Sequence, residues 1–240
     1  MLGKRLPIKN MILAALSGRE YKRLLPDLES ISLPLDVILY RSGETIEHVY
    51  FPDEGLVSLV TKMKNGTTIE VGLIGKDGMV GIPVLLGDNI AFEEAIVQIA
   101  GSAMRMKTNV FKEGLRSDHN PLLTQLLLYT RTLMKQVAQT AACNRLHTVE
   151  ERLSRWLLMC HDRIDSDELQ LKQEFISNML GVRRASVGTA ATALQARGLI
   201  RYSRGRISIL KREEMEEFTC ECYRAVAGES RMSSEQSLSQ

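Results

Sequence analysis

The sequence predicts an α+β fold: an N-terminal β-roll of the jelly-roll type, one long helix, and a C-terminal winged helix-turn-helix. Three observations support this prediction. Residues 31–107 are short β-branched runs separated by glycine turns, at the regular spacing of a sandwich or barrel. Residues 119–146 repeat apolar side chains at helical spacing. Residues 172–212 have the pattern of two short helices around a tight turn, followed by a small hairpin.

The predicted domain boundaries follow from these segments. Residues 1–147 form the β-roll with its long helix, residues 148–228 form the helix-turn-helix domain, and residues 229–240 are a Ser/Gln-rich tail expected to be disordered. The hydrophobic content of 44% and charged content of 25% are typical of soluble globular proteins. The longest apolar runs fall far short of a membrane span of about 20 residues, and no signal-peptide pattern follows the N-terminus. We expect a cytoplasmic protein with no membrane partner.

In chain order, the first expected element is a helix over Met11–Leu25, which Pro26 ends. Short strands are then expected within residues 36–44, 48–60, 67–75 and 95–106. Turns are expected at Ser42-Gly43, Glu54-Gly55, Asn65-Gly66 and Lys76-Asp77-Gly78. An Asn-Gly pair between two alternating strands is a strong hairpin signal, so a β-hairpin is predicted around Asn65-Gly66.

The long helix is expected to begin with Asp118 as its N-cap and Pro121 in its first turn, and to end near Asn144. It has two adjacent apolar seams, whereas a helix packed on one surface needs a single stripe. We therefore expect one seam to lie on the β-roll and the other to meet a second copy in a homodimer. The alternative is one wide stripe buried within the monomer. The first seam is Leu122, Leu126, Tyr129 and Leu133, and the second is Leu123, Leu127, Met134, Val137 and Ala141. The residues assigned to the dimer interface are Leu122, Leu126, Tyr129, Leu133 and Val137.

The helix-turn-helix pattern can be followed at single residues. Ile176, Met179 and Leu180 give the first helix an apolar face, and Gly181 supplies the backbone conformation that ends it. The second helix has its buried face at i, i+3, i+4 and i+7. That face is Val187, Ala190, Ala191 and Leu194. The outward residues are small, which lets a helix backbone lie deep in a DNA major groove about 12 Å wide. They are Ala185, Gly188, Thr189 and Thr192.

Positive charge is concentrated in the same segment. Residues 172–212 hold nine Lys or Arg and one acid, a net charge of +8; the whole chain is +2, so the remainder is −6. A basic helix-turn-helix on an otherwise acidic chain matches the phosphate backbone of duplex DNA. The alternative is a solvated basic surface on a small helical domain. The coincidence of these charges with the helix-turn-helix pattern favours DNA binding.

The basic residues are expected to have two roles. Arg183 and Arg184 stand in the first turn of the second helix, where two cations oppose the helix dipole and where a recognition helix contacts base edges. Arg204 lies with Gly205 at the tip of the hairpin, where phosphate contacts position a domain without reading sequence. The predicted DNA-binding residues are Gln173, Arg183, Arg184, Ala185, Ser186, Thr189, Arg201, Arg204 and Arg206.

This order of elements resembles the CRP/FNR family of bacterial transcription regulators, from about Asn10 to Val226. The most specific stretch is LGVRRASVGTAATALQARGLI, and the run Val149–Leu158 is similar to the helix that opens the family's C-terminal domain. The matching positions in the first stretch are Gly181, Arg184, Val187, Gly188, Gly198, Leu199 and Ile200. The resemblance implies a cyclic-nucleotide-binding-like β-roll, a dimerising helix, and binding of double-stranded DNA that activates or represses transcription. Ala185 and Thr189 depart from the family's frequent contact residues, so a different target sequence is expected.

Two further departures concern ligands. Where cyclic-nucleotide-responsive members have a ribose-binding glutamate after a glycine, this chain has Met79 after Gly78, and methionine is a weak hydrogen-bond acceptor. Where they have an arginine for the phosphate, this chain has Glu93-Glu94-Ala95, whose carboxylates repel a phosphate. This degenerate pocket is therefore not expected to bind cyclic AMP. The N-terminal cysteine cluster of the oxygen-sensing branch is also absent, because the first cysteine is Cys143.

No other motif predicts a catalytic or metal centre. Cys220 and Cys222 are separated by one residue, but no third and fourth ligand lie at a suitable spacing, so we interpret both as ordinary cysteines. The histidines show no metal-ligand spacing, and a haem with one axial side chain would leave no motif. We expect no enzymatic activity, no metal and no cofactor.

Two questions stay open at this point: the role of one acidic run, and the functional class of the whole chain. The acidic run 161–168 is either a solvated loop or a surface offered to RNA polymerase. The whole chain is either a DNA-binding regulator or a ligand-binding or metal-dependent β-barrel protein whose helical domain docks a protein. A third class for the whole chain is an enzyme with a cupin-like metal site, and the lack of a His-rich strand motif disfavours this class.

Overall fold

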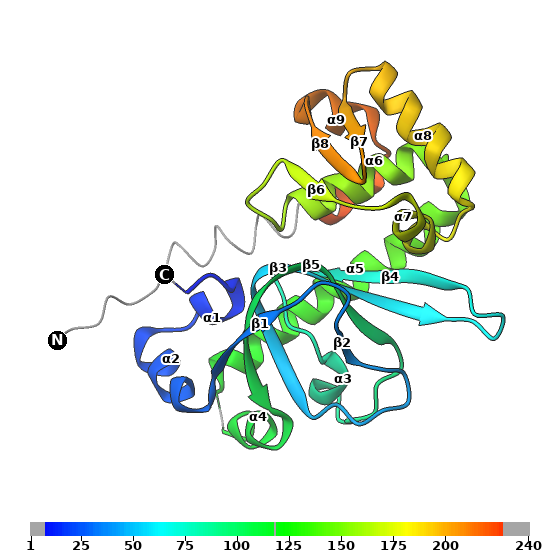
Figure 1. Ribbon diagram of the computed structural model, residues 1–240. Coiled ribbons are helices and arrows are strands. Elements are labelled where there is room, and N and C mark those ends of the chain that lie inside the picture. The colour runs from blue at the N-terminus through cyan, green and yellow to red at the C-terminus, as the bar shows by residue number, and fades with distance from the viewer. Residues whose placement is uncertain (1–7, 118, 228–240) are drawn as a thin grey trace.

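The computed structural model describes residues 8–117 and 119–227, which form two domains connected by one long helix (Figure 1). The N-terminal domain contains α1 (Met11–Ala14), α2 (Gly18–Leu24), the 3-10 turn η1 (Leu25–Asp27), β1 (Glu29–Leu33), β2 (Ile38–Tyr40), β3 (His48–Lys62), β4 (Thr68–Ile74), α3 (Ile82–Leu85), β5 (Glu94–Lys107) and α4 (Thr108–Gly114). The long helix is α5 (Pro121–Leu146). The C-terminal domain contains α6 (Val149–His161), β6 (Glu168–Gln170), α7 (Gln173–Leu180), α8 (Arg184–Ala196), β7 (Ile200–Ser203), β8 (Arg206–Ile209) and α9 (Arg212–Phe218).

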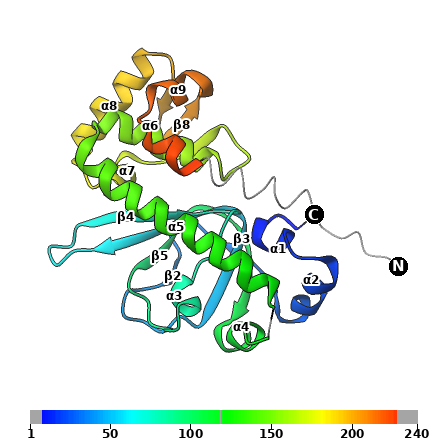
Figure 2. The ribbon, with the colours of Figure 1, turned by 180° about the vertical axis from the view of Figure 1, so that it is seen from behind.

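Antiparallel pairing builds the expected β-roll. The strands pair in the order β1-β5-β3-β4, and β2 pairs with the start of β5. The two longest strands, β3 and β5, pair along almost their whole length, from His48 opposite Lys107 to Val60 opposite Glu94. Side chains such as Phe51 of β3 fill the interior of the roll, and α5 crosses its open face (Figure 2).

The turn predicted at Glu54-Gly55 is wrong, because β3 continues through these residues as a bulge. The pairing register with β5 shifts on both sides of Glu54. Gly55 has a φ of +83°, and a side chain on Gly101 of β5 would collide with the backbone of Glu54. Glycines on both strands therefore permit the bulge. The hairpin predicted at Asn65-Gly66 is confirmed: it connects β3 to β4, and the amide of Met63 donates to the carbonyl of Thr67 at 2.8 Å.

The single helix predicted over Met11–Leu25 is also wrong, because two helices, α1 and α2, replace it. Ser17 starts α2 as its N-cap, accepting from the amide of Glu20 at 3.3 Å, while the Glu20 carboxylate accepts from the amide of Ser17 at 3.0 Å. This reciprocal capping box is written in the sequence as S-x-x-E, and it overrides the continuous apolar pattern.

The long helix has the predicted extent but a different cap. Asn120 is its N-cap and accepts from the amide of Leu123 at 3.2 Å, with Pro121 as the first helical residue. The predicted cap, Asp118, lies outside the described residues.

The first seam of α5 does not form the dimer interface, and that assignment is wrong for four of its five residues. Leu122, Leu126 and Leu133 are buried in the β-roll core of the same chain, and Tyr129 packs against it. Val137 belongs to the second seam and is exposed. The packing is close because the roll presents glycines to α5. A Cβ on Gly78 would lie 2.4 Å from the Tyr129 side chain, and a Cβ on Gly72 would lie 3.3 Å from that of Leu133.

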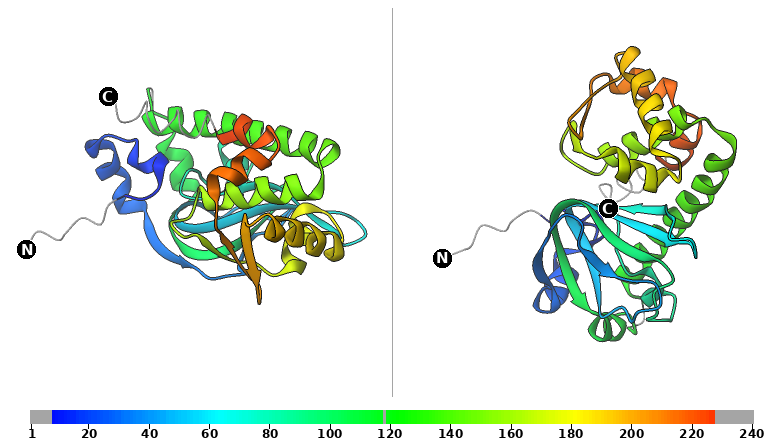
Figure 3. Two further views of the ribbon diagram at one scale, coloured as in Figure 1. Left: turned by 90° about the horizontal axis from the view of Figure 1, so that it is seen from above. Right: turned by 45° about the vertical axis from the view of Figure 1, so that its right-hand side comes forward.

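The C-terminal domain packs directly on the β3–β4 part of the roll (Figure 3). Leu56, Val60 and Leu73 of the roll belong to the hydrophobic core of the C-terminal domain. Polar contacts cross the same boundary, including an ion pair of 2.8 Å between Arg163, which follows α6, and Asp77 of the roll. The two domains therefore pack against each other in this structure.

The C-terminal domain adds one strand that the sequence pattern did not predict. β6 pairs with β8, and β8 pairs with β7, which extends the predicted hairpin. The acidic run before β6 is held by cations of the same chain: Asp162 pairs with Arg212 at 2.5 Å, and Asp165 with Lys76 at 2.6 Å. Contact of this run with RNA polymerase stays a prediction. Within residues 8–117 and 119–227, no helix combines the length and the apolar character needed to cross a membrane.

Candidate nucleic-acid interface

The turn between α7 and α8 depends on Gly181. This residue has a φ of +60°, in the left-handed region, and its amide donates to the carbonyl of Asn178 at 3.2 Å. A Cβ at this position would lie 2.8 Å from the side chain of Ile69 on β4. Gly181 thus satisfies two constraints, because it ends α7 and lets the turn approach the β-roll.

The two faces of α8 are as predicted. Val187, Ala190, Ala191 and Leu194 are buried, and Ala185, Thr189 and Thr192 are exposed. The outward threonines bond back to their own helix: the hydroxyl of Thr189 donates to the carbonyl of Ala185 at 3.2 Å, and that of Thr192 to Gly188 at 2.9 Å. The outer surface of α8 is therefore narrow and polar, without a long side chain in its middle.

The N-terminal end of α8 is open. Arg183 occupies the N-cap position and Arg184 the first helical position, both exposed. No side chain of the described residues caps this end, so its amides and the positive end of the helix dipole face solvent beside two guanidinium groups. Such an end binds anionic groups.

The β7–β8 hairpin forms a wing beside the helices. Arg204 and Gly205 at its tip have φ values of +50° and +77°, as a two-residue type I′ turn requires. Arginine in this conformation is unusual, because asparagine or glycine would adopt it at lower cost. The wing is held against the start of α7: the Tyr202 hydroxyl donates to the carbonyl of Leu171 at 3.0 Å, and the Leu171 amide to that of Gly205 at 2.7 Å.

An open cleft between the wing and the two helices brings several predicted residues together. Its lining consists of Lys172, Gln173, Glu174, Arg184, Tyr202, Ser203, Arg204 and Gly205. Arg201 and Arg206 lie on the exposed face of the wing sheet. Lys172 and Tyr202 were missed as site residues, although Lys172 stands next to Gln173 in the basic run.

Some of the basic residues within 172–212 contact other side chains of the same chain. The guanidinium of Arg197 lies 4.7 Å from the centre of the Phe218 ring, and Lys211 and Arg212 pair with glutamates of α9. Arg206 is within 3.4 Å of Glu168 but remains exposed. The charge available to a nucleic acid therefore comes mainly from the residues around the cleft.

The degenerate pocket of the β-roll is filled by the protein's own side chains. Met79 and Ala95 are fully buried, and Glu93 is buried beside Tyr40, whose hydroxyl donates to its Oε1 at 3.4 Å. Burial raises the pKa of Glu93 above its usual value. Glu94 points elsewhere and lies 3.8 Å from Arg41. Whether the pocket rejects cyclic AMP stays a prediction.

Two protein-family models match this chain. Residues 31–118 match the cyclic nucleotide-binding domain, and residues 151–218 match the Crp-like helix-turn-helix domain. The chain belongs to the CRP/FNR family. The predicted family, fold class and helix-turn-helix DNA-binding domain are thereby confirmed. Members of this family are transcription regulators.

Solved structures of other regulators share the fold. FixK2 from Bradyrhizobium japonicum is 17% identical with a TM-score of 0.69, covering 80% of this chain and 98% of its own. A CRP-family regulator from Thermus thermophilus is 20% identical with a TM-score of 0.63, covering 82% and 96%. The c-di-GMP-responsive global regulator CLP from Xanthomonas campestris is 14% identical with a TM-score of 0.64, covering 81% and 100%. No curated protein matches the sequence.

Proposed function

We propose that this CRP/FNR-family regulator binds an imperfect palindrome in double-stranded DNA as a homodimer and thereby controls transcription. The observation that carries the proposal is the surface of α8, with small outward side chains behind the exposed Arg183 and Arg184 at an uncapped helix end. In the proposed complex, α8 lies in the major groove and its arginines reach base edges. The wing contacts phosphates through Arg204.

The homodimer is supported by the second seam of α5. Leu127 and Met134 are 54% and 68% exposed on the face that points away from the β-roll, and Val137 follows at 38%. Leu127 and Met134 are one heptad apart, which is the spacing of a helix–helix seam. A two-fold pair of α5 helices would cover these side chains and present two recognition helices about one DNA turn apart.

A helical domain that docks a protein is less well supported. Protein-docking surfaces have exposed apolar patches. The large apolar side chains that are exposed in the described part of the chain lie outside α7, α8 and the strands of the wing. Arginines, threonines and small residues form that surface instead.

Arg184→Ala is expected to relax base preference at one position in each half-site. An arginine in this place makes a bidentate contact with guanine, worth about 1–3 kcal/mol of discrimination. Alanine keeps the helix and removes that contact. Selection of bound fragments from a random duplex pool, compared between the variant and the native protein, measures the change.

Arg204→Asn is the matched comparison. Asparagine tolerates the left-handed conformation at the hairpin tip, so the wing should fold. The loss of one phosphate contact should weaken binding to all sequences alike and reduce the slope of log affinity against log salt by about 0.9. If Arg184→Ala retains the native base preference, α8 is not the reading helix and the proposal is wrong.

We also infer that the sensor domain does not respond to cyclic AMP or cyclic GMP. The support is that Met79, a weak acceptor, stands where the ribose needs a strong one, and that the buried carboxyl of Glu93 stands where the phosphate needs a cation. Calorimetry is expected to show no saturable binding of either nucleotide, and DNA affinity should not change when nucleotide is added. Binding of either nucleotide at micromolar concentration would contradict this inference.

A further inference from the structure

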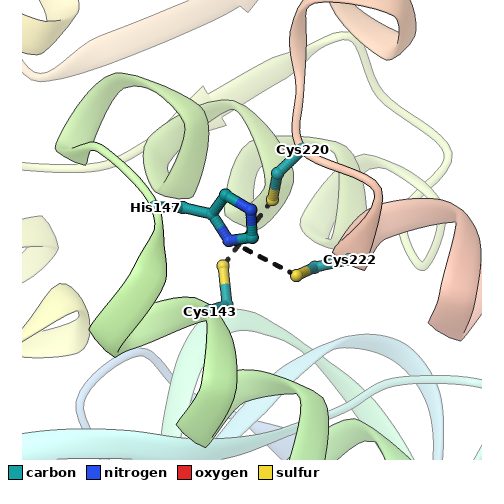
Figure 4. A group of neighbouring side chains, drawn as sticks. All are labelled: Cys143, His147, Cys220 and Cys222. Atoms are coloured by element: carbon teal, nitrogen blue, oxygen red, sulfur yellow. Dashed lines mark hydrogen bonds between the residues drawn. The ribbon is translucent and has the colours of Figure 1, made fainter.

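Three cysteines and a histidine converge where α5 meets the C-terminal domain (Figure 4). Cys143 and His147 lie one turn apart at the end of α5, and Cys220 and Cys222 follow α9. The four potential ligand atoms all lie within 4.8 Å of one another. The sulfur atoms of Cys143 and Cys220 are 3.7 Å apart, and the sulfur of Cys222 is 3.5 Å from Nδ1 of His147.

The two shorter separations, 3.7 Å between two sulfurs and 3.5 Å between a sulfur and a nitrogen, match edges of a tetrahedron around one metal ion. Zinc–sulfur and zinc–nitrogen bonds of about 2.3 and 2.05 Å place two sulfurs about 3.8 Å apart, and a sulfur and a nitrogen about 3.6 Å apart. A disulfide requires sulfurs only about 2.05 Å apart, and all four cysteines of the chain are free thiols. An iron–sulfur cluster places its own sulfides between the thiolates and therefore needs a more widely spread ligand set.

We propose that Cys143, His147, Cys220 and Cys222 bind a structural zinc ion that ties the end of α5 to the C-terminal segment of the DNA-binding domain. Three thiolates and one imidazole form a closed, four-coordinate set of the structural type, with no position left for a substrate. Thiolates also select zinc over the hard cations magnesium and calcium.

The surroundings suit this ion. The carboxylate of Glu221 lies 3.2 Å from Nε2 of His147, which leaves Nδ1 directed at the cysteines, as an outer carboxylate does in histidine–zinc sites. Gln139 donates to the sulfur of Cys222 at 3.0 Å. Zinc with three thiolates carries a net charge of −1, and Arg155 of α6 interacts electrostatically with Cys143. The Nε atom of Arg155 is buried with no hydrogen-bond partner among the described residues.

The fourth cysteine shows what an ordinary buried thiol looks like in this protein. Cys160 lies within the hydrophobic core of the C-terminal domain, where a thiol packs as a small apolar group. Cys143, Cys220 and Cys222 instead form a buried cluster of their own, outside both hydrophobic cores. The sequence pattern gave no third and fourth ligand near Cys220, because the fold supplies them from a helix 77 residues earlier.

The position of the site gives it a consequence for the regulator. His147 is the C-cap of α5, and only Thr148, the N-cap of α6, separates it from that helix. The proposed ion therefore joins both sides of the connection between α5 and the DNA-binding domain. Metal-binding energy at such a site is also folding energy. Removal of the ion should therefore weaken the packing of the DNA-binding domain against α5 and lower the melting temperature of the protein.

Elemental analysis of the full chain, purified under reducing conditions without a histidine tag, tests the proposal. One zinc per chain is expected in the native protein and in Cys160→Ala, the matched control. Cys143→Ala and Cys222→Ala are expected to lose it. Glu221→Gln alters only an exposed carboxylate, so it should fold, and it should bind zinc about 10-fold more weakly in a chelator competition.

Cobalt titration of the native protein gives a readout that needs no variant. The expected result is a one-to-one end point with the absorption bands of tetrahedral cobalt bound to thiolates. Native protein that is fully reduced and takes up neither zinc nor cobalt would overturn the proposal. So would full zinc retention in Cys143→Ala and Cys222→Ala, or thiol counting that reveals a disulfide between Cys143 and Cys220 in place of the metal.

Discussion

Met134→Glu is expected to convert the homodimer into monomers and to lower the affinity for a palindromic DNA site by about 100-fold or more. Met134 is 68% exposed in the monomer, so the substitution leaves the folded chain intact. In the proposed dimer, it places a charge in the α5 seam, where burial without a partner is costly. A monomer then binds one half-site and loses the gain from two linked contacts. Light scattering measures the mass, and fluorescence anisotropy measures the DNA affinity.

Two comparisons make this test specific. Met63→Glu introduces the same change at a methionine that is 56% exposed in the β3–β4 turn, and this variant should remain dimeric. Leu126→Glu buries the charge in the β-roll core, where the side chain is 0% exposed, and should unfold the domain instead. A dimer of Met134→Glu at micromolar concentration, with native DNA affinity, would show that α5 is not the interface.

The existence of two seams on α5 could be predicted from the sequence, but their assignment could not. Both seams have the same helical period and similar side chains. The choice between them depends on where the β-roll offers room, and that room comes from Gly72 and Gly78, which lie against Leu133 and Tyr129. The sequence of α5 alone does not show which of its seams faces the glycines on β4 and on the turn that follows it.

The same distinction separates the two sites of this protein. The helix-turn-helix could be predicted because its determinants are local: Gly181 ends one helix, and the apolar face of α8 repeats within four turns. The Cys143 cluster could not be predicted, because its ligands meet only after α5 and the segment after α9 are packed together. Capping of α2 by Ser17 was local too, and a search for S-x-x-E would have found it.

The boundary between the domains contains a buried carboxyl whose role was equally hidden in the sequence. Glu70 of β4 is buried, and its Oε1 accepts from the indole nitrogen of Trp156 on α6 at 2.8 Å. Its Oε2 is 2.6 Å from the hydroxyl of Ser58, which is also 2.5 Å from Oε1 of Gln98. The single hydroxyl hydrogen of Ser58 cannot serve both acceptors. A protonated Glu70 that donates to Ser58 lets Ser58 donate to Gln98, and both short contacts are then hydrogen bonds.

Burial raises the pKa of Glu70 from its usual value of 4.5 to about 7. Between these two pH values the folded state holds a proton that the unfolded state releases, so this group makes stability fall as pH rises from about 4.5 to 7. Above that window the loss is complete, and the shift corresponds to about 3 kcal/mol. Glu70→Gln mimics the protonated carboxyl, so the variant should match the native protein near pH 5 and exceed its stability at pH 8.

The difference should appear as a rise in melting temperature of about 6–12 °C at pH 8 in Glu70→Gln, with little change at pH 5. Trp156 is the sole tryptophan of the chain and bonds directly to Glu70, so its fluorescence reports the titration in the folded state. That signal should change with a midpoint near 7 in the native protein and stay flat in Glu70→Gln.

Glu47→Gln, at an exposed position of the same domain, is the control and should keep the native profile. A native titration with its midpoint near 4.5, or a Glu70→Gln protein that is less stable than the native one at pH 8, would show that Glu70 is ionised in the folded state. In that case the Ser58 hydroxyl must leave one of its two short contacts unbonded.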